Sequence, residues 1–139
     1  MTKHLTLVIL FSAQLVGCAS YVAVTPTEVM YIKASALTKL SASVESTVRY
    51  ENPPENISDE DLLILATAHD PSLLVPFADY TLKVLKADQH SAVLVCTKDS
   101  AQGLLEDAGC TAAMDAHHWK NEGILCDFTL NLSTLCAAP

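Results

Sequence analysis

The chain has 139 residues, half of them hydrophobic, which is enough for one domain with its own core and too few for two domains of ordinary size. Asp and Glu outnumber Lys and Arg by 16 to 8, so the net charge at pH 7 is −8. An acidic surface repels phosphates and anionic lipid headgroups, and this charge therefore argues against nucleic-acid binding and against polybasic docking on a membrane.

The chain opens with a short charged start and an apolar run. Lys3 precedes a mainly apolar stretch that extends from Leu5 to Val16. Because a bilayer span needs about 20 apolar residues, the stretch is too short to cross a membrane, and its length is typical of the apolar region of a signal peptide. The alternative is a buried N-terminal helix or strand, which the positive charge before the run and the small residues after it disfavour.

The end of this run carries the most specific motif in the sequence. Leu15-Val16-Gly17-Cys18 resembles the lipobox of bacterial lipoproteins. The resemblance implies cleavage between Gly17 and Cys18 and attachment of fatty acids such as palmitate to Cys18, and two or three acyl chains anchor a protein stably. Ordinary signal cleavage after Ala19 is the competing interpretation.

The same resemblance predicts the location of the mature protein. In Gram-negative lipoproteins an Asp after the lipidated Cys favours the inner membrane, whereas Ala19 and Ser20 follow Cys18 here, which implies the outer membrane. We therefore expect a signal peptide over residues 1–17, a lipidated Cys and short tether over 18–28, and a single domain over 29–139.

The first element of the domain is predicted to be an amphipathic helix of sixteen to twenty residues between 29 and 50. Its apolar positions fall at helical spacing: Leu37, Leu40, Val44 and Val48. Many Ser and Thr lower the helix propensity, so packing must hold the helix. The run Asn52-Pro53-Pro54 ends it.

A second helix is predicted to begin after Ser58. Ser58 and Asp61 have capping-box spacing, and Asp59 and Glu60 favour the positive end of the helix. This acidic first turn explains the three carboxylates more simply than a cation site does. Asp70-Pro71 ends the helix, and residues 71–77 are predicted to add a short helical turn.

The remaining elements are shorter. Residues 80–85 and 92–96 alternate or run apolar and predict an antiparallel hairpin around a turn at 88–90. We further expect short helices over 101–108, closed by Gly109, and over 111–119, and a third strand over 125–132. The predicted class is α+β, with two N-terminal helices followed by a small, mainly antiparallel sheet stabilised by disulfides.

The cysteine count is odd, at five, which calls for an explanation in an exported protein. The lipobox accounts for Cys18, and in an oxidising compartment the other four form two disulfides, with three pairings open. These four are Cys96, Cys110, Cys126 and Cys136. A zinc site is the alternative, but the sequence lacks the tight cysteine or histidine pairs that structural zinc uses.

The strongest cluster of reactive side chains is Asp115, His117 and His118, beside Trp119. These residues are weak candidates for a metal or small-ligand site, and the alternative is that Trp119 fills a disulfide-rich core. Glu106-Asp107 is interpreted as the solvated face of a short helix rather than as an acid/base pair.

No nucleophile elbow, phosphate-binding loop or Cys-x-x-Cys motif occurs in the sequence, so we expect neither an enzyme nor a cofactor. The leading hypothesis is a lipid-anchored envelope protein that binds another protein as an accessory factor of a complex. The alternative is a periplasmic lipoprotein that binds a metal or small ligand through Asp115, His117 and His118.

Overall fold

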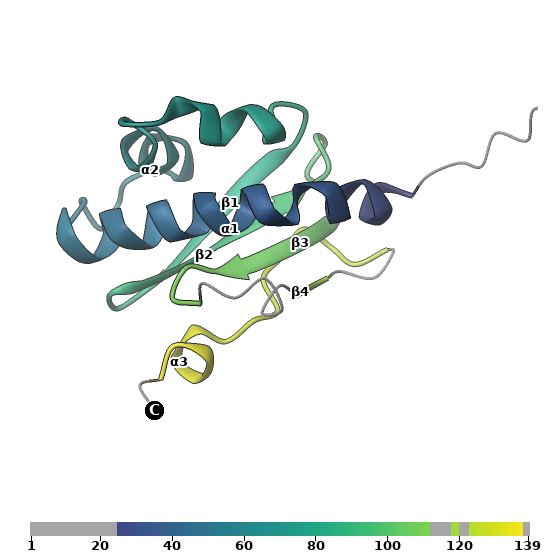
Figure 1. Cartoon of the computed structure of the whole chain (residues 1–139). Helices are drawn as coiled ribbons and strands as arrows, with labels where there is room; N and C mark the ends of the chain where they lie inside the picture. The colour runs from purple at the N-terminus through teal and green to yellow at the C-terminus, as the bar shows by residue number, and fades with distance from the viewer. Residues whose placement is uncertain (1–24, 112–117, 120–122, 138–139) are drawn as a thin grey trace, which may run out of the picture.

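A layer of helices packs on a small antiparallel sheet in the computed structural model, which describes residues 25–111, 118–119 and 123–137 (Figure 1). The elements in chain order are α1 (Pro26–Tyr50), α2 (Asp59–Ala66), the 3₁₀ helix η1 (Pro71–Phe77), β1 (Thr81–Ala87), β2 (His90–Cys96), β3 (Gly103–Ala108), β4 (His118–Trp119) and α3 (Leu132–Leu135). Helices, an antiparallel sheet and two disulfides confirm the predicted α+β class.

Helix α1 is longer than the predicted sixteen to twenty residues, at 25 residues, and it begins at Pro26 rather than at 29. The cause is a capping box: the Thr25 hydroxyl accepts from the Glu28 N–H, and the Glu28 carboxylate accepts from the Thr25 N–H. Pro26 occupies the first turn, where its missing N–H costs nothing. Part of the predicted tether is therefore the first turn of this helix.

The second helix begins where its capping signal lies. The Ser58 hydroxyl accepts from the Asp61 N–H at 3.1 Å, and the acidic residues at 59–61 fill the first turn. The helix ends at Ala66, and Asp70 caps η1 by accepting from the Ser72 N–H. Phe77 is buried at the end of η1, and Leu73 and Leu74 pack against the main core.

The sheet has the order β1-β2-β3-β4 and all its pairs are antiparallel. β1 and β2 form the predicted hairpin, with register from Thr81 opposite Cys96 to Ala87 opposite His90. β2 is buried on both faces, which explains why residues 92–96 are continuously apolar rather than alternating.

The helix predicted over 101–108 is wrong, because residues 103–108 form strand β3. Leu, Glu and Ala favour a helix locally, but this segment pairs with β2 along its whole length, and its carboxylates find partners on both sides of the sheet. Long-range pairing therefore overrides local propensity. The helix predicted over 111–119 is also wrong at 118–119, which form β4, and residues 112–117 lie outside the described chain.

The strand predicted over 125–132 is wrong as well. Leu125 makes one isolated bridge to Gln102, and 132–135 form helix α3. Cys126 is bonded to Cys96 on the central strand β2, whose side chain stands out of the plane of the sheet. The bond therefore draws this segment across the face of the sheet instead of along its edge.

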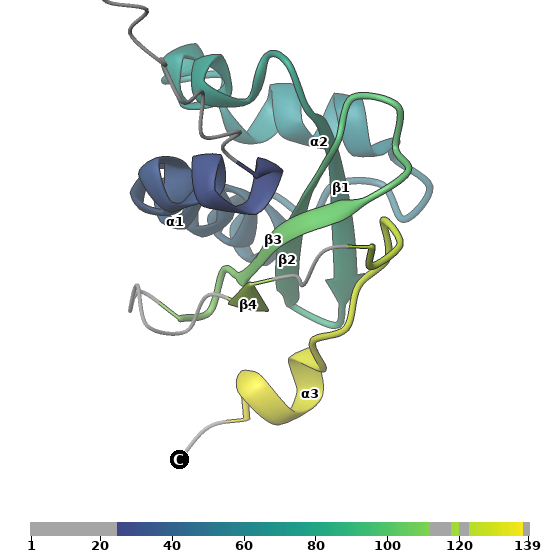
Figure 2. The ribbon, with the colours of Figure 1, turned by 90° about the vertical axis from the view of Figure 1, so that its right-hand side faces the viewer.

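The sheet is covered on both faces (Figure 2). One face packs against α1, α2 and η1 in a core that includes Leu37, Leu40 and Val93. The other face packs against the C-terminal segment through Ala92, Ala108, Leu130 and Leu132. In the described ranges no helix is both long enough and apolar enough to cross a membrane.

Candidate functional site

The cysteines after position 90 form two disulfides with different surroundings. Cys96 is bonded to Cys126 and Cys110 to Cys136, with Cα–Cα distances of 5.6 and 5.7 Å. The two disulfides predicted from the cysteine count are therefore present, in one of the three pairings that the sequence left open. Both Cys96 and Cys126 are buried, whereas Cys110 and Cys136 are only half-buried.

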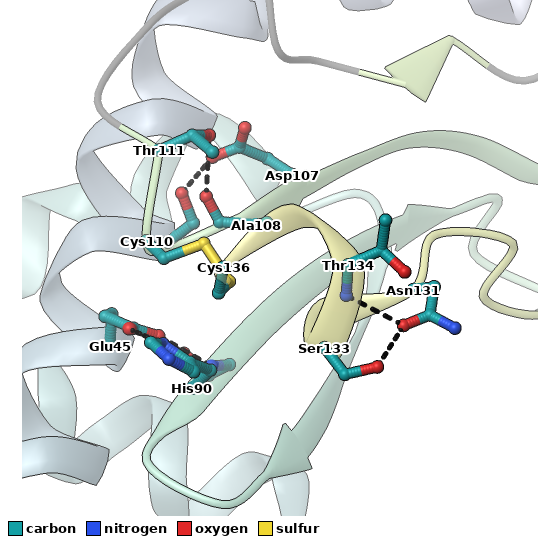
Figure 3. The surroundings of a disulfide bond; sticks show 12 residues. Glu45, His90, Asp107, Ala108, Cys110, Thr111, Asn131, Ser133, Thr134 and Cys136 are labelled. Atoms are coloured by element: carbon teal, nitrogen blue, oxygen red, sulfur yellow. Dashed lines mark hydrogen bonds and ion pairs between the residues drawn. A yellow bond between two sulfur atoms is a disulfide. The ribbon is translucent and has the colours of Figure 1, made fainter. Parts of the chain in front are cut away.

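A buried carboxylate on α1 organises the region beside Cys110–Cys136 (Figure 3). Oε1 of Glu45 lies 2.7 Å from Nδ1 of His90 and 3.2 Å from Nε of Arg49. Oε2 accepts from the Ser91 N–H at 2.6 Å and from the Ser91 hydroxyl at 3.1 Å. A carboxylate only accepts hydrogen bonds, so a hydrogen bond between these two groups requires a proton on Nδ1, and the neutral imidazole with that proton has its lone pair on Nε2.

The imidazole of His90 also lies beside the disulfide. One of its nitrogens and the sulfurs of Cys110 and Cys136 lie within 4.8 Å of one another, and in the described residues no other three His, Cys, Asp or Glu side chains meet in this way. Two thiolates and an imidazole are zinc ligands. The two sulfurs are bonded to each other, however, so the oxidised cluster does not present thiolates to a metal.

The interpretation of Glu106 and Asp107 as a solvated face is wrong, because both side chains are buried in β3. Glu106 accepts from the Thr129 N–H at 2.9 Å and from the Thr129 hydroxyl. Asp107 accepts from the Ser41 hydroxyl of α1. Neighbours on a strand point to opposite faces, so these carboxylates join the sheet to the layers above and below it.

An apolar groove of about 480 Å³ lies between α2, η1 and strand β1. Its apolar walls come from Leu63, Ile64, Leu74, Phe77, Tyr80 and Leu82, and Glu60 adds a carboxylate. Ile64 is 56% exposed, and Val75 of η1 is 70% exposed. Within the described sheet β1 pairs with β2 alone, so the groove lies next to an open strand edge.

A second, more polar hollow of about 510 Å³ lies near the end of α1, lined by Asn52, Glu55 and Lys86 among others. Lys86 donates from its amino group to the carbonyl oxygens of Pro54 and Glu55, at 3.4 and 3.0 Å. These bonds link β1 to the loop after α1. The charged group of Lys86 in this hollow therefore has a structural partner in the fold.

Several predicted site residues lie outside the described chain: Cys18, Asp115 and His117. His118 and Trp119 are described only as strand β4, which pairs with Glu106 and Leu105 of β3. The grouping of Glu45, His90 and the second disulfide was missed from the sequence. Its only local signal is that His90 and Ser91 follow a tight turn, and nothing in the spacing links them to Glu45 on α1.

Comparison of the chain with protein-family models, with curated protein sequences and with solved structures finds no match.

Proposed function

We propose that the chain is a bacterial lipoprotein of the cell envelope, anchored through Cys18, that acts by binding another protein. The proposed localisation rests on Leu15-Val16-Gly17-Cys18, which resembles the lipobox. The absence of Asp after Cys18 favours the outer membrane. In this proposal the protein is an accessory factor rather than an enzyme.

The apolar groove beside β1 is the observation that carries the binding function. An exposed apolar groove next to an open strand edge fits an extended segment, which adds backbone hydrogen bonds to the edge while its side chains enter the groove. Ile64 lines the groove and is a large apolar side chain left in water, and exposed apolar surface of this kind marks interaction sites.

The acidic residues around the groove indicate the charge of the segment that it binds. Glu60 lies in the groove, Asp59 and Asp61 are its neighbours on α2, and the chain as a whole carries −8. We therefore expect the bound segment to be apolar in its centre and flanked by Lys or Arg, because complementary charge speeds encounter and suppresses wrong partners.

Affinity capture from detergent-solubilised membranes tests this function. The full chain is expected to recover a partner, and Ile64→Asp should abolish recovery because it places a charge in the apolar groove without disturbing the core. Ile32→Asp is the matched control, since Ile32 is 87% exposed on α1 and does not line the groove.

A photo-crosslinker at position 64 should then form an adduct with the partner that was recovered, and sequencing the adduct should show a basic-flanked apolar segment. Recovery of the protein alone in mild detergent contradicts the proposal. Equal recovery of the partner by Ile64→Asp and Ile32→Asp would show that the groove is not the binding site.

A further inference from the structure

We propose that Cys110–Cys136 is an exchangeable disulfide, opened by an incoming dithiol, and that His90 transfers the proton during the exchange. The contrast between the two disulfides is the first support. Cys96–Cys126 is buried in the apolar face of the sheet, whereas Cys110 and Cys136 are half-buried. A thiol must reach a disulfide to attack it, so exposure separates labile disulfides from inert ones.

The position of His90 is the second support. A nitrogen of its ring and both sulfurs lie within 4.8 Å of one another, and the Glu45 carboxylate holds the ring in place through Nδ1 at 2.7 Å. Histidine takes up and releases a proton near neutral pH. A ring fixed by a buried carboxylate beside two sulfurs places a group that can take up and release a proton next to the bond that exchange breaks.

The exchange proceeds in two steps, each of which forms one S–S bond and breaks another. His90 takes the proton of an incoming thiol, and the thiolate forms a bond to one cysteine sulfur. The Cys110–Cys136 bond breaks, its electron pair leaves on the other sulfur, and His90 returns the proton there. The second thiol of the dithiol then attacks the dithiol's own sulfur in the mixed disulfide, the protein's cysteine sulfur leaves with the bonding electron pair, and it takes up the proton that the second thiol gives up. Two electrons and two protons thus pass to the protein, and the dithiol becomes a disulfide.

Opening this bond has a structural consequence. Helix α3 has four residues, too few to be stable without tertiary contacts, and Cys136 ties its end to Cys110. Cys126 remains bonded to Cys96. We therefore expect exchange to free the chain around α3 while the sheet persists, which hydrogen exchange resolves as lost protection in 130–136 and retained protection in β2.

Dithiothreitol is the probe for the test, applied to the purified full-length chain at pH 7 without denaturant. Alkylation at timed intervals and peptide mapping by mass spectrometry follow each disulfide separately. We expect Cys110–Cys136 to open at least about tenfold faster than Cys96–Cys126, with urea below the unfolding transition leaving the rate unchanged.

His90→Asn tests the proton transfer, because Asn retains a donor close to the position of Nδ1 and removes Nε2. We expect opening of Cys110–Cys136 to slow at least about fivefold at pH 7, where the probe is mainly thiol, and to match the wild type at about pH 9.5, where it is mainly thiolate. His69→Asn, at an exposed position, is the matched control and should change neither rate. Among the described residues, the Glu45 carboxylate contacts His90 and is paired in turn with Arg49, and both charged groups are unchanged in each variant.

Two results overturn the inference. One is opening of both disulfides at the same rate, or only as the protein unfolds. The other is an unchanged rate in His90→Asn at pH 7. If His90→Asn does not fold, the comparison of the two disulfides in the wild type still decides whether Cys110–Cys136 is exchangeable.

Discussion

Gly109 follows the end of β3 and packs closely against α1. A Cβ at this position would lie 2.5 Å from Cβ of Glu45 and closer still to the carbonyl oxygen of Ser41. Its own N–H donates to the carbonyl oxygen of Ser91 at 2.9 Å. The absence of a side chain thus lets β2, β3 and the buried Glu45 come together beside His90.

Gly109→Ala is therefore expected to lower the free energy of unfolding by about 3 kcal/mol, because the added methyl meets backbone that cannot move aside cheaply. Gly123→Ala provides the comparison: nothing lies within 4 Å of its Cβ, and only its φ of 79° opposes the change, at about 1 kcal/mol. Urea titration monitored by circular dichroism measures both. Equal losses in the two variants would contradict the close approach at Gly109.

At the scale of elements, short-range signals set where each helix begins. Thr25 and Glu28 cap α1 reciprocally, and hydrogen bonds from the N–H and then the hydroxyl of Thr25 hold the pKa of Glu28 below its ordinary value of 4.5. A carboxyl group with a lowered pKa in the folded state stabilises the fold at pH values above 4.5, and this contribution is lost as the pH falls through the lowered pKa.

Thr25→Ala removes the capping hydroxyl and the second of the two hydrogen bonds that lower the pKa of Glu28, while the backbone N–H bond remains. It should therefore lower the stability at pH 6 and have a smaller effect as the pH falls through the lowered pKa of Glu28. The measurement is the difference in Tm between variant and wild type across this range. Ser46→Ala, at an exposed position within α1, should show a small difference that does not change with pH. If the loss of stability in Thr25→Ala is the same from pH 6 to pH 3, the ionised Glu28 carboxylate does not contribute to the cap.

At the scale of the whole molecule, the proposed anchor and the groove belong to different parts of the chain. The motif that resembles a lipobox lies before residue 25, and the groove is formed by α2, η1 and β1. Binding and anchoring should therefore be separable, and loss of the lipid should leave the domain folded and its groove intact.

If the proposed anchor is correct, Cys18→Ser should move the protein from the membrane pellet to the soluble fraction, because the proposal assigns membrane attachment to fatty acid rather than to protein surface. Intact-mass spectrometry of the wild type should show cleavage before Cys18, added acyl mass and two oxidised cysteine pairs. Ala19→Asp, which the lipobox resemblance associates with inner-membrane retention, should remain in the pellet but shift to inner-membrane fractions. A water-soluble wild type with an unmodified thiol at position 18 would disprove the anchor.

Local pattern alone indicated those elements whose signals lie within a few residues of one another. The spacing of Leu37, Leu40 and Val44, the cap at Ser58 and the run at 92–96 each correspond to an observed helix or strand. The need for two disulfides also followed from the count of cysteines. These features depend on residues that are neighbours in sequence, so they can be predicted from the sequence without knowledge of the tertiary structure.

Only the tertiary structure decided the features that join distant segments. Residues 103–108 have helical propensity and become a strand because β2 offers a pairing edge. The buried carboxylates of Glu106 and Asp107 accept hydrogen bonds from Thr129 and Ser41, which lie far away in sequence. The disulfide pairing, the meeting of Glu45 with His90, and the groove arise in the same way. Each depends on contacts between residues tens of positions apart, and no local period in the sequence encodes which of them will meet.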